Sequence, residues 1–320
     1  MPHDDTLLYV QELKAYYKTP NGLVKAVDNV SFTVRRNEIF GIAGESGCGK
    51  STLAMAILRL LKPPGFINGG KVLFKGKNVL KLSPKELREI RWKSLSYIPQ
   101  SSMNALNPVL RIKDQFIDMF KERGIKKEEK EYEEMIKELL INVGLAPEVM
   151  NMYPHELSGG MRQRTIIAMA IALRPELIIA DEPTTALDVV IQRGIIQLLS
   201  EIRRKYNIAI ILITHDMAVH AELADRIGIM YAGKIVEIGS TYEIFKKPLH
   251  PYTDALINSI PILGVKKTLK GIKGLPPDLK NPPPGCRFHP RCPMAMDICK
   301  LQEPPLISIN NRKVACFLYR

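Results

Sequence analysis

Residues 44–52 set the folding pattern of this chain, and they read Gly44-Glu45-Ser46-Gly47-Cys48-Gly49-Lys50-Ser51-Thr52. The run matches the phosphate-binding loop, in which Gly and four further residues precede Gly-Lys-Ser or Gly-Lys-Thr. The apolar residues 39–43 before it are typical of a short buried strand, and residues 52–58 after it begin a helix. A strand, a glycine-rich loop and a helix in this order favour a phosphate site over a chance match in a glycine-rich turn.

The chemistry of this loop follows from its residue types. Glycines allow several backbone N–H groups to converge on an anion, and the start of a helix adds the positive end of its dipole. Lys50 would reach the β- and γ-phosphates of a nucleotide, while the Ser51 hydroxyl would bind Mg²⁺. The sequence therefore predicts a magnesium-dependent nucleotide site.

The composition is that of a globular protein without membrane-spanning segments. Charged residues make up 25% and hydrophobic residues 46% of the 320 residues, and no apolar run approaches the ~18 residues of a membrane helix. Residues 1–5 lack the basic and apolar regions of a signal peptide, so we expect a cytosolic chain. Residues 246–320 hold 13 Lys or Arg against 4 Asp or Glu and carry most of the net charge of +13. Such a tail could face nucleic acid, an anionic membrane or an acidic cofactor.

Alternating apolar and polar positions predict strands within residues 7–43, 71–74 and 95–100. Tyr17 lies upstream of the loop, where its ring could stack on an adenine or could be a half-buried strand residue. Gln100 ends the last of these strands, and its amide could reach a metal ion or an attacking water, or lie solvated in a loop.

The pattern becomes helical between about residues 105 and 165. Apolar residues recur at helical spacing within 112–120 and 136–143. Residues 121–138 carry 13 charges among 18 positions, nearly balanced in sign, which we interpret as a solvated helical face. This insert predicts a helical subdomain outside the sheet.

Further polar motifs follow the insert. The run Leu157-Ser158-Gly159-Gly160-Met161-Arg162-Gln163 opens an apolar helix, whose first N–H groups form a second natural anion site. The apolar residues 177–180 predict a buried strand that ends in Asp181, which can support Mg²⁺, and Glu182, which can orient or deprotonate water. Another apolar strand over 208–214 delivers His215, a candidate γ-phosphate sensor or a structural histidine.

In this order and at these spacings, the motifs resemble the nucleotide-binding subunit of an ABC transporter over roughly residues 7–245. The Leu-Ser-Gly-Gly-Met-Arg-Gln signature is the most specific part of the resemblance. The resemblance implies an α/β fold, with a P-loop NTPase core, an N-terminal antiparallel β region, a helical subdomain and a small C-terminal domain rich in Pro and Cys. It also implies ATP hydrolysis.

The resemblance further implies a role for each matching residue. Gly44, Ser46, Gly47, Cys48, Gly49, Lys50, Ser51 and Thr52 would form the Walker A loop, with Tyr17 on the adenine. Ser51, Gln100 and Asp181 would serve Mg²⁺, while Glu182, His215 and Gln100 would be catalytic. Ser158, Gly159, Gly160 and Asp188 would act on the nucleotide of a second subunit, identical or homologous to this one.

The C-terminal region narrows the resemblance. His250-Pro251-Tyr252-Thr253-Asp254-Ala255-Leu256, a proline-rich linker and Pro290-Arg291-Cys292-Pro293 are similar to the oligopeptide/dipeptide importer subfamily. This implies import of dipeptides or oligopeptides through two separate permease subunits at the cytoplasmic face of the membrane, with an extracytoplasmic binding protein as an indirect partner. Nickel importers share much of the pattern and give an alternative substrate. We expect an ATPase domain over 1–245 and a C-terminal domain over 246–320.

Four cysteines lie close together in this tail, at Cys286, Cys292, Cys299 and Cys316. A cytosolic location disfavours disulfides, and the spacing departs from the short knuckles of zinc sites. A [4Fe–4S] cluster tolerates irregular spacing, and some dipeptide importer ATPases carry one, so we favour it over zinc or uncommitted thiols. We expect its loss to leave ATP binding at Lys50 nearly unchanged, and we expect Cys48 to be inert.

A rival function from another class is an ABC ATPase that acts on nucleic acid through its basic tail. Such proteins usually add long coiled coils, a second ATPase domain or zinc insertions, none of which the sequence contains. We therefore expect no nucleic-acid partner.

Overall fold

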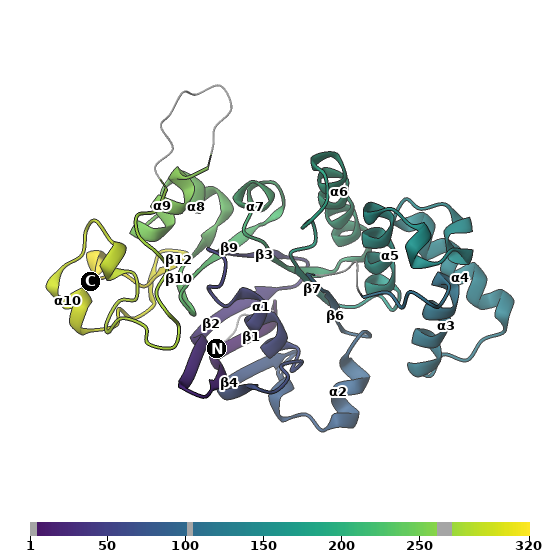
Figure 1. Ribbon diagram of the computed structural model, residues 1–320, viewed down its shortest axis with the longest axis horizontal. Helices are drawn as coiled ribbons and strands as arrows, with labels where there is room; N and C mark the ends of the chain where they lie inside the picture. Colours follow the sequence, from purple (N-terminus) through teal and green to yellow (C-terminus); the bar gives the residue numbers. More distant parts are fainter. Residues whose placement is uncertain (1–4, 101–104, 261–270) are drawn as a thin grey trace. The chain divides into compact units, whose positions relative to one another are not determined.

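The computed structural model describes residues 5–100, 105–260 and 271–320, and Figure 1 shows its ribbon. The chain divides into two compact units. Unit 1 holds residues 1–82 and 211–320, and unit 2 holds residues 83–210.

Unit 1 contains a four-stranded antiparallel sheet in the order β2-β1-β4-β5. Its strands are β1 (Thr6–Thr19), β2 (Gly22–Arg35), β4 (Gly65–Phe74) and β5 (Lys77–Asn78). Leu8, Val10 and Leu13 of β1 have no exposed surface, while the residues between them are more exposed, so one face of the ribbon is buried. The strands predicted over residues 7–43 and 71–74 are therefore present, with β4 beginning earlier, at Gly65.

A second sheet of unit 1 carries the phosphate loop. Its strands lie in the order β11-β12-β10-β9-β3, and only the pair β3 and β9 is parallel. They are β3 (Ile39–Ala43), β9 (Arg226–Tyr231), β10 (Lys234–Ser240), β11 (Ile307–Ile309) and β12 (Arg312–Val314). All five residues of β3 are buried, as its continuous apolar sequence predicts.

The helices of unit 1 are short. They are α1 (Lys50–Ile57), α7 (Met217–Leu223), α8 (Thr241–Lys246), α9 (Pro251–Asn258) and α10 (Asp297–Leu301). Helix α1 packs against β1 and β2, and α7 packs against β3. Helix α8 begins at a capping box between Ser240 and Glu243, which satisfies N–H groups that the helix leaves free.

The tail adds β11 and β12 to the sheet of unit 1 through β10. Glu237 of β10 faces Val314 of β12, and Ile238 faces Lys313. The fully buried Glu237 carboxylate accepts a hydrogen bond from Arg312, and it also accepts the backbone N–H groups of Leu249 and His250. A buried charge is tolerated only with such partners, so this carboxylate holds β10, β12 and the start of α9 together.

Unit 2 is mainly helical. Its elements are α2 (Pro84–Ile90), β6 (Leu95–Ile98), α3 (Ile112–Glu122), α4 (Glu129–Asn142), α5 (Gly159–Ile171), β7 (Leu177–Asp181) and α6 (Val189–Tyr206). Strands β6 and β7 are parallel. Phe116 and Phe120 of α3 are fully buried, and the Phe120 ring stacks on Tyr132 of α4 with 6.0 Å between ring centroids. Helices thus occupy the segments where apolar residues recur at helical spacing.

Two predicted strand boundaries differ in the structure. Strand β6 ends at Ile98, so Gln100 lies in a turn and not at the strand end. Strand β8 (Ala209–Ile213) spans the boundary of the two units and stops before Thr214. Among the described residues, no helix has both the length and the hydropathy that crossing a membrane requires.

Candidate functional site

The phosphate loop of unit 1 joins β3 to α1, and its glycines are required by the backbone. Gly49 has a φ of 107°, and a Cβ there would lie 1.9 Å from the Ala26 carbonyl oxygen. At Gly44, where φ is 154°, a Cβ would lie 2.1 Å from the Met230 carbonyl oxygen. No side chain fits at either position, so the neighbouring strands β2 and β9 force the loop to keep these two glycines.

Lys50 is the cation of this loop. Its side chain bends back over the loop, and Nζ donates to the carbonyl oxygens of Gly44 at 2.8 Å and Glu45 at 3.0 Å. Lys50 is only 7% exposed, so burial strengthens its interaction with a nearby anion. The ammonium group is therefore held at the loop, where it can donate to phosphate oxygens.

Cys48 is a buried residue of the same loop. Burial raises the pKa of its thiol, although the neighbouring Lys50 opposes the shift. A thiol with a raised pKa is a weak nucleophile at neutral pH, which agrees with the prediction that Cys48 is inert.

Tyr17, near the end of β1, lies beside the phosphate loop. Its hydroxyl is 3.2 Å from Thr52 Oγ1, and a Cβ on Gly65 would come within 2.9 Å of its ring. The structure thus brings the half-buried Tyr17 together with the loop.

His215 is an exposed residue of unit 1 that follows Thr214 after β8. A second histidine, His220 of α7, is fully buried and places Nε2 3.2 Å from the Thr214 carbonyl oxygen. Burial lowers the pKa of His220 to about 4. A Cβ on Gly41 would lie 2.5 Å from His220 Nδ1, so this ring packs directly on β3. Sequence reasoning missed His220, because its burial depends on the packing of α7 against β3.

Unit 2 carries the two acids at the end of β7. Asp181 is 1% exposed and accepts a hydrogen bond from the Tyr97 hydroxyl at 3.2 Å. Burial, together with the Asp181 charge, raises the pKa of Tyr97 above its usual range. Glu182 is 7% exposed, adopts a φ of 50° and accepts a hydrogen bond from Thr185 Oγ1 at 2.9 Å. The neighbouring hydroxyls hold both carboxylates in defined orientations.

The Ser-Gly-Gly motif of unit 2 forms the start of α5. Ser158 is the N-cap, and its hydroxyl accepts the Met161 N–H at 3.3 Å. Gly160 allows α5 to approach α6, because a Cβ there would lie 2.8 Å from Ile191 Cγ2. Asp188 caps α6 by accepting the Ile191 N–H at 2.9 Å. The motif and Asp188 are thus brought together, with the Ser158 and Asp188 side chains exposed.

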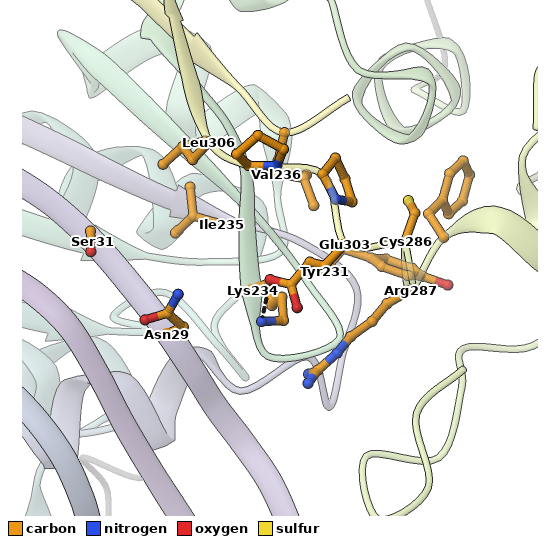
Figure 2. Close-up of a pocket in the computed structure, with 14 residues that line it drawn as sticks. Asn29, Ser31, Tyr231, Lys234, Ile235, Val236, Cys286, Arg287, Glu303 and Leu306 are labelled. Carbon is orange, nitrogen blue, oxygen red and sulfur yellow. Dashed lines mark ion pairs between the residues drawn. The ribbon is translucent and has the colours of Figure 1, made fainter. Parts of the chain in front are cut away.

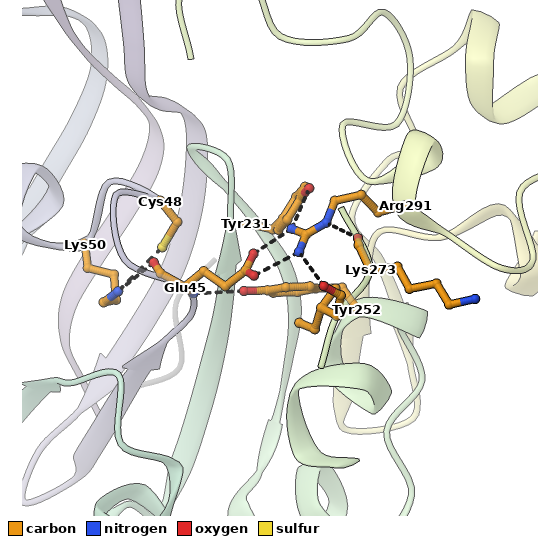
Figure 3. A network of polar contacts seen from close by, with 8 residues as sticks. Glu45, Cys48, Lys50, Tyr231, Tyr252, Lys273 and Arg291 are labelled. Carbon is orange, nitrogen blue, oxygen red and sulfur yellow. Dashed lines mark hydrogen bonds and ion pairs between the residues drawn. The ribbon is translucent and has the colours of Figure 1, made fainter. Parts of the chain in front are cut away.

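A polar network links the phosphate loop to the tail within unit 1 (Figure 3). Arg291 donates to both carboxylate oxygens of Glu45, at 2.7 and 3.0 Å, and to the Tyr231 hydroxyl at 3.3 Å. The Glu45 N–H donates to the Tyr252 hydroxyl at 2.9 Å. Sequence reasoning missed this network, because Arg291 and Glu45 are 246 positions apart.

The four cysteines of the tail are all free thiols. Burial raises the pKa of Cys286 to about 11, and Coulombic interaction with Cys299, Cys316 and Cys292 adds to the shift. The Cys286 N–H donates to the Cys299 carbonyl oxygen at 2.8 Å. Cys286 also lines a cavity of roughly 110 Å³ beside Arg287 and Phe288 (Figure 2). In the described part of the chain, however, no three His, Cys, Asp or Glu side chains are arranged to hold a metal ion.

Comparisons with known proteins agree with this fold and these motifs. Residues 27–185 match the ABC transporter family, and residues 236–299 match the oligopeptide/dipeptide transporter C-terminal region. A dipeptide transport ATP-binding protein from Caldanaerobacter subterraneus is 46% identical over 316 residues, which cover 98% of this chain and 97% of that protein. An oligopeptide transport ATP-binding protein from Escherichia coli is 44% identical and is covered to 93%.

Solved structures give the same result. A dimeric ATP-binding cassette in a post-hydrolysis state, bound to ADP and Pi, aligns with a TM-score of 0.66 at 27% identity and covers 73% of this chain and 98% of its own. A cassette of an ABC transporter complex from Clostridium perfringens aligns with a TM-score of 0.64 at 28% identity, covering 76% of this chain and 92% of its own. The chain therefore belongs to the ABC transporter family of ATPases, in the branch with the oligopeptide/dipeptide C-terminal region. The α/β P-loop fold and the ATPase activity predicted from the sequence are confirmed.

Proposed function

We propose that this chain is the nucleotide-binding subunit that powers uptake of dipeptides or oligopeptides through separate permease subunits. The observation that carries the proposal is the 46% identity to a dipeptide transport ATP-binding protein over nearly the full length of both chains. The match includes the tail, which distinguishes this branch from cassettes that lack it. A loop that can bind phosphate and a signature helix supply the ATPase part of the function.

The roles of the site residues belong to the same proposal. Lys50 binds the β- and γ-phosphates, Ser51 and Asp181 support Mg²⁺, and Tyr17 stacks on the adenine. Glu182 orients or deprotonates the attacking water, assisted by His215 and Gln100. The defined orientation of the Asp181 and Glu182 carboxylates and the position of Tyr17 beside the loop support these assignments.

The proposed assembly contains two nucleotide-binding subunits, two permease subunits and, indirectly, an extracytoplasmic binding protein. Each nucleotide meets the Walker A loop of one subunit and Ser158, Gly159 and Gly160 of the other, with Asp188 at the seam. The exposed side chains of Ser158 and Asp188 support a role outside their own subunit. Such a subunit works at the cytoplasmic face of the membrane, with ATP binding closing the pair and hydrolysis reopening it.

We also propose two functional regions, an ATPase region over 1–245, whose helical subdomain covers about 105–165, and a C-terminal region over 246–320. The separate family matches to 27–185 and 236–299 support a division of this kind. In the fold, the C-terminal region contributes β11 and β12 to the sheet of unit 1.

Cys286, Cys292, Cys299 and Cys316 are proposed to hold a [4Fe–4S] cluster, with zinc as the alternative. Backbone N–H groups of Phe288, Met294 and Leu318 donate to three of the four sulfurs. Such hydrogen bonds stabilise thiolates and tune the potentials of cluster sulfurs. Four free thiols are the donor set that a [4Fe–4S] cluster uses.

The peptide assignment is tested with the complete transporter in liposomes that contain ATP. Labelled dipeptides and oligopeptides should accumulate against a gradient, while Ni²⁺ at the same concentration should not. Accumulation of Ni²⁺ alone would contradict the peptide assignment. Salt-dependent binding of the purified chain to DNA or RNA, without peptide uptake, would favour a nucleic-acid ATPase instead.

The cluster is tested by purification without oxygen from iron-fed cells. The protein should contain about four iron and four sulfide per chain and absorb broadly in the visible range. Cys292→Ser should abolish this absorption, while Cys48→Ser, the control outside the tail, should leave it unchanged. Stoichiometric zinc without iron would contradict the cluster.

A further inference from the structure

The contact between Arg291 and Glu45 joins the cysteine-bearing tail to the phosphate loop by a bidentate ion pair. The guanidinium donates to both carboxylate oxygens of Glu45, and Nε donates to the Lys273 carbonyl oxygen at 2.9 Å. The Arg291 side chain is 5% exposed and that of Glu45 is 24% exposed. A bidentate pair with one buried and one partly exposed side chain has a defined geometry and is screened less than an exposed pair, so it can fix the position of Glu45.

Glu45 is held at its backbone as well as at its side chain. Its N–H donates to the Tyr252 hydroxyl, and its carbonyl oxygen accepts a hydrogen bond from Lys50 Nζ. Tyr252 is fully buried in α9, with its ring centroid 4.5 Å from that of Tyr231. One residue of the phosphate loop is therefore fixed by groups from α9 and from the segment that bears Cys292, and it directly contacts the phosphate-binding lysine (Figure 3).

The charge of Glu45 matters for nucleotide binding. A carboxylate within the phosphate loop repels the negative phosphates of ATP. Arg291 compensates this charge and keeps the carboxylate turned to the tail. Removing the guanidinium leaves an uncompensated carboxylate in the loop, although the Glu45 backbone keeps its hydrogen bonds to Tyr252 and Lys50.

We propose that Arg291 is a positioning residue for the phosphate loop, through which the cysteine-bearing tail sets the affinity for ATP. The proposal rests on the proposed function of the loop as the ATP site, and it adds a residue from outside every nucleotide-binding motif. Because linkage is reciprocal, ATP bound at the loop stabilises residues 286–299 of the tail.

The affinity of the full-length chain for a non-hydrolysable ATP analogue tests the proposal. Arg291→Ala should raise the Kd about tenfold, a change typical of coupled sites. Adding Glu45→Gln to Arg291→Ala should restore most of the affinity, because the uncompensated charge is gone. The Kd of Arg291→Lys should lie between that of wild type and that of Arg291→Ala. In the assembled transporter, the KM for ATP should rise while kcat stays nearly unchanged, because Arg291 does not touch the reacting atoms.

Arg226→Ala is the matched control. Arg226 of β9 forms another arginine–glutamate pair, with Nη1 2.9 Å from Glu38 Oε1, and Glu38 directly precedes β3 at the end of that strand remote from the loop. This variant should lose stability without losing ATP affinity. If it weakens ATP binding as much as Arg291→Ala does, the effect is general destabilisation and the proposal is wrong.

Hydrogen exchange of the wild-type chain gives a test that needs no variant. Amides of residues 286–299 should exchange more slowly when the analogue is bound. Unchanged exchange there, or a Kd for Arg291→Ala within about twofold of wild type, contradicts the proposal while wild-type ATP binding still supports the proposed function. A wild-type chain that binds no nucleotide contradicts both.

Discussion

At the scale of single residues, Lys50 supplies the positive charge of the phosphate loop. Its ammonium group is nearly buried and is satisfied by two carbonyl oxygens of the loop itself. Charged hydrogen bonds to phosphate oxygens are stronger than those to neutral carbonyls. Lys50 can therefore exchange its hydrogen bonds with the two carbonyl oxygens for bonds to phosphate oxygens. Its own charge is already buried, so this exchange costs no further desolvation of the ammonium group.

Lys50→Ala should weaken binding of a non-hydrolysable ATP analogue by about 10- to 100-fold, the loss expected for one charged hydrogen-bonding group. Calorimetric titration of the full chain measures the effect. Lys300→Ala, which removes an exposed lysine paired with Asp297, is the control and should bind normally. Equal affinities in the two variants would mean that the loop is not the phosphate site.

The residues of the loop could be predicted from the sequence because they are contiguous and each has a fixed chemical task. Gly44 and Gly49 are required by backbone contacts with neighbouring strands, and the motif already contains them. Arg291 could not be predicted, because its function depends on a contact made only when the tail folds onto the loop. The roles of Gln100 and His215, both exposed, stay predictions.

At the scale of elements, α5 depends on Ser158 for its first turn. The hydroxyl caps the helix, and loss of such a cap typically costs about 1 kcal/mol. The same residue is proposed to contact the nucleotide of the second subunit. A substitution therefore combines a local effect on stability with a distant effect on hydrolysis.

Ser158→Arg should abolish steady-state ATP hydrolysis by the assembled transporter, while the isolated chain still binds ATP. The long cation blocks the contact with the other subunit's nucleotide. Ser158→Ala is the matched comparison, since it loses the same cap of about 1 kcal/mol and the same hydroxyl but leaves the space open, so it should lower hydrolysis less than Ser158→Arg does. Loss of ATP binding by the isolated Arg variant would rule out action across the dimer.

Two buried histidines make the elements of unit 1 sensitive to acid. Burial lowers the pKa of His220 in α7 to about 4 and that of His250 at the start of α9 to about 3. In the unfolded chain both histidines bind protons near the ordinary pKa of about 6.5. Between about pH 6.5 and the lowered pKa values, the folded state therefore binds fewer protons than the unfolded state. Their contribution to stability is complete above about pH 6.5 and is lost as the pH falls toward 4.

Unfolding by urea should therefore show a loss of about 2 kcal/mol per buried histidine between pH 7 and pH 5. His220→Gln should be less stable at pH 7 but should have a shallower pH dependence. His155→Gln, which changes an exposed histidine, should keep the wild-type slope. Identical slopes in all three proteins would contradict the assignment of His220 as a neutral buried group.

The strands beside the functional motifs could be predicted from the sequence, whereas the three-residue strands of the tail could not. Strand β3 is a five-residue apolar run and strand β7 is a four-residue apolar run that ends in Asp181, and both are fully buried as predicted. Strands β11 and β12 have only three residues each, too few for a period of two to be visible. Their place beside β10 depends on the buried pair of Arg312 and Glu237, which local pattern does not reveal.

At the scale of the whole molecule, the chain is a cassette ATPase with a tail that contacts its phosphate loop. The family is established by relatives that match almost the full chain, so the tail is as much part of the match as the loop. Sequence motifs predicted the family, since each motif is local and specific. Substrate identity has no comparable local signal, because peptides are bound by other subunits of the assembly we propose.

The most direct test of the central claim measures ATP hydrolysis and peptide uptake together in liposomes that contain the complete transporter. Glu182→Gln keeps the shape of the side chain but removes the general base, so it should bind ATP normally and lower both rates by at least about a hundredfold. Wild type should take up peptide only with ATP, in constant proportion to the phosphate released. Peptide uptake at the wild-type rate with Glu182→Gln, or ATP hydrolysis that continues at the wild-type rate, would contradict the account.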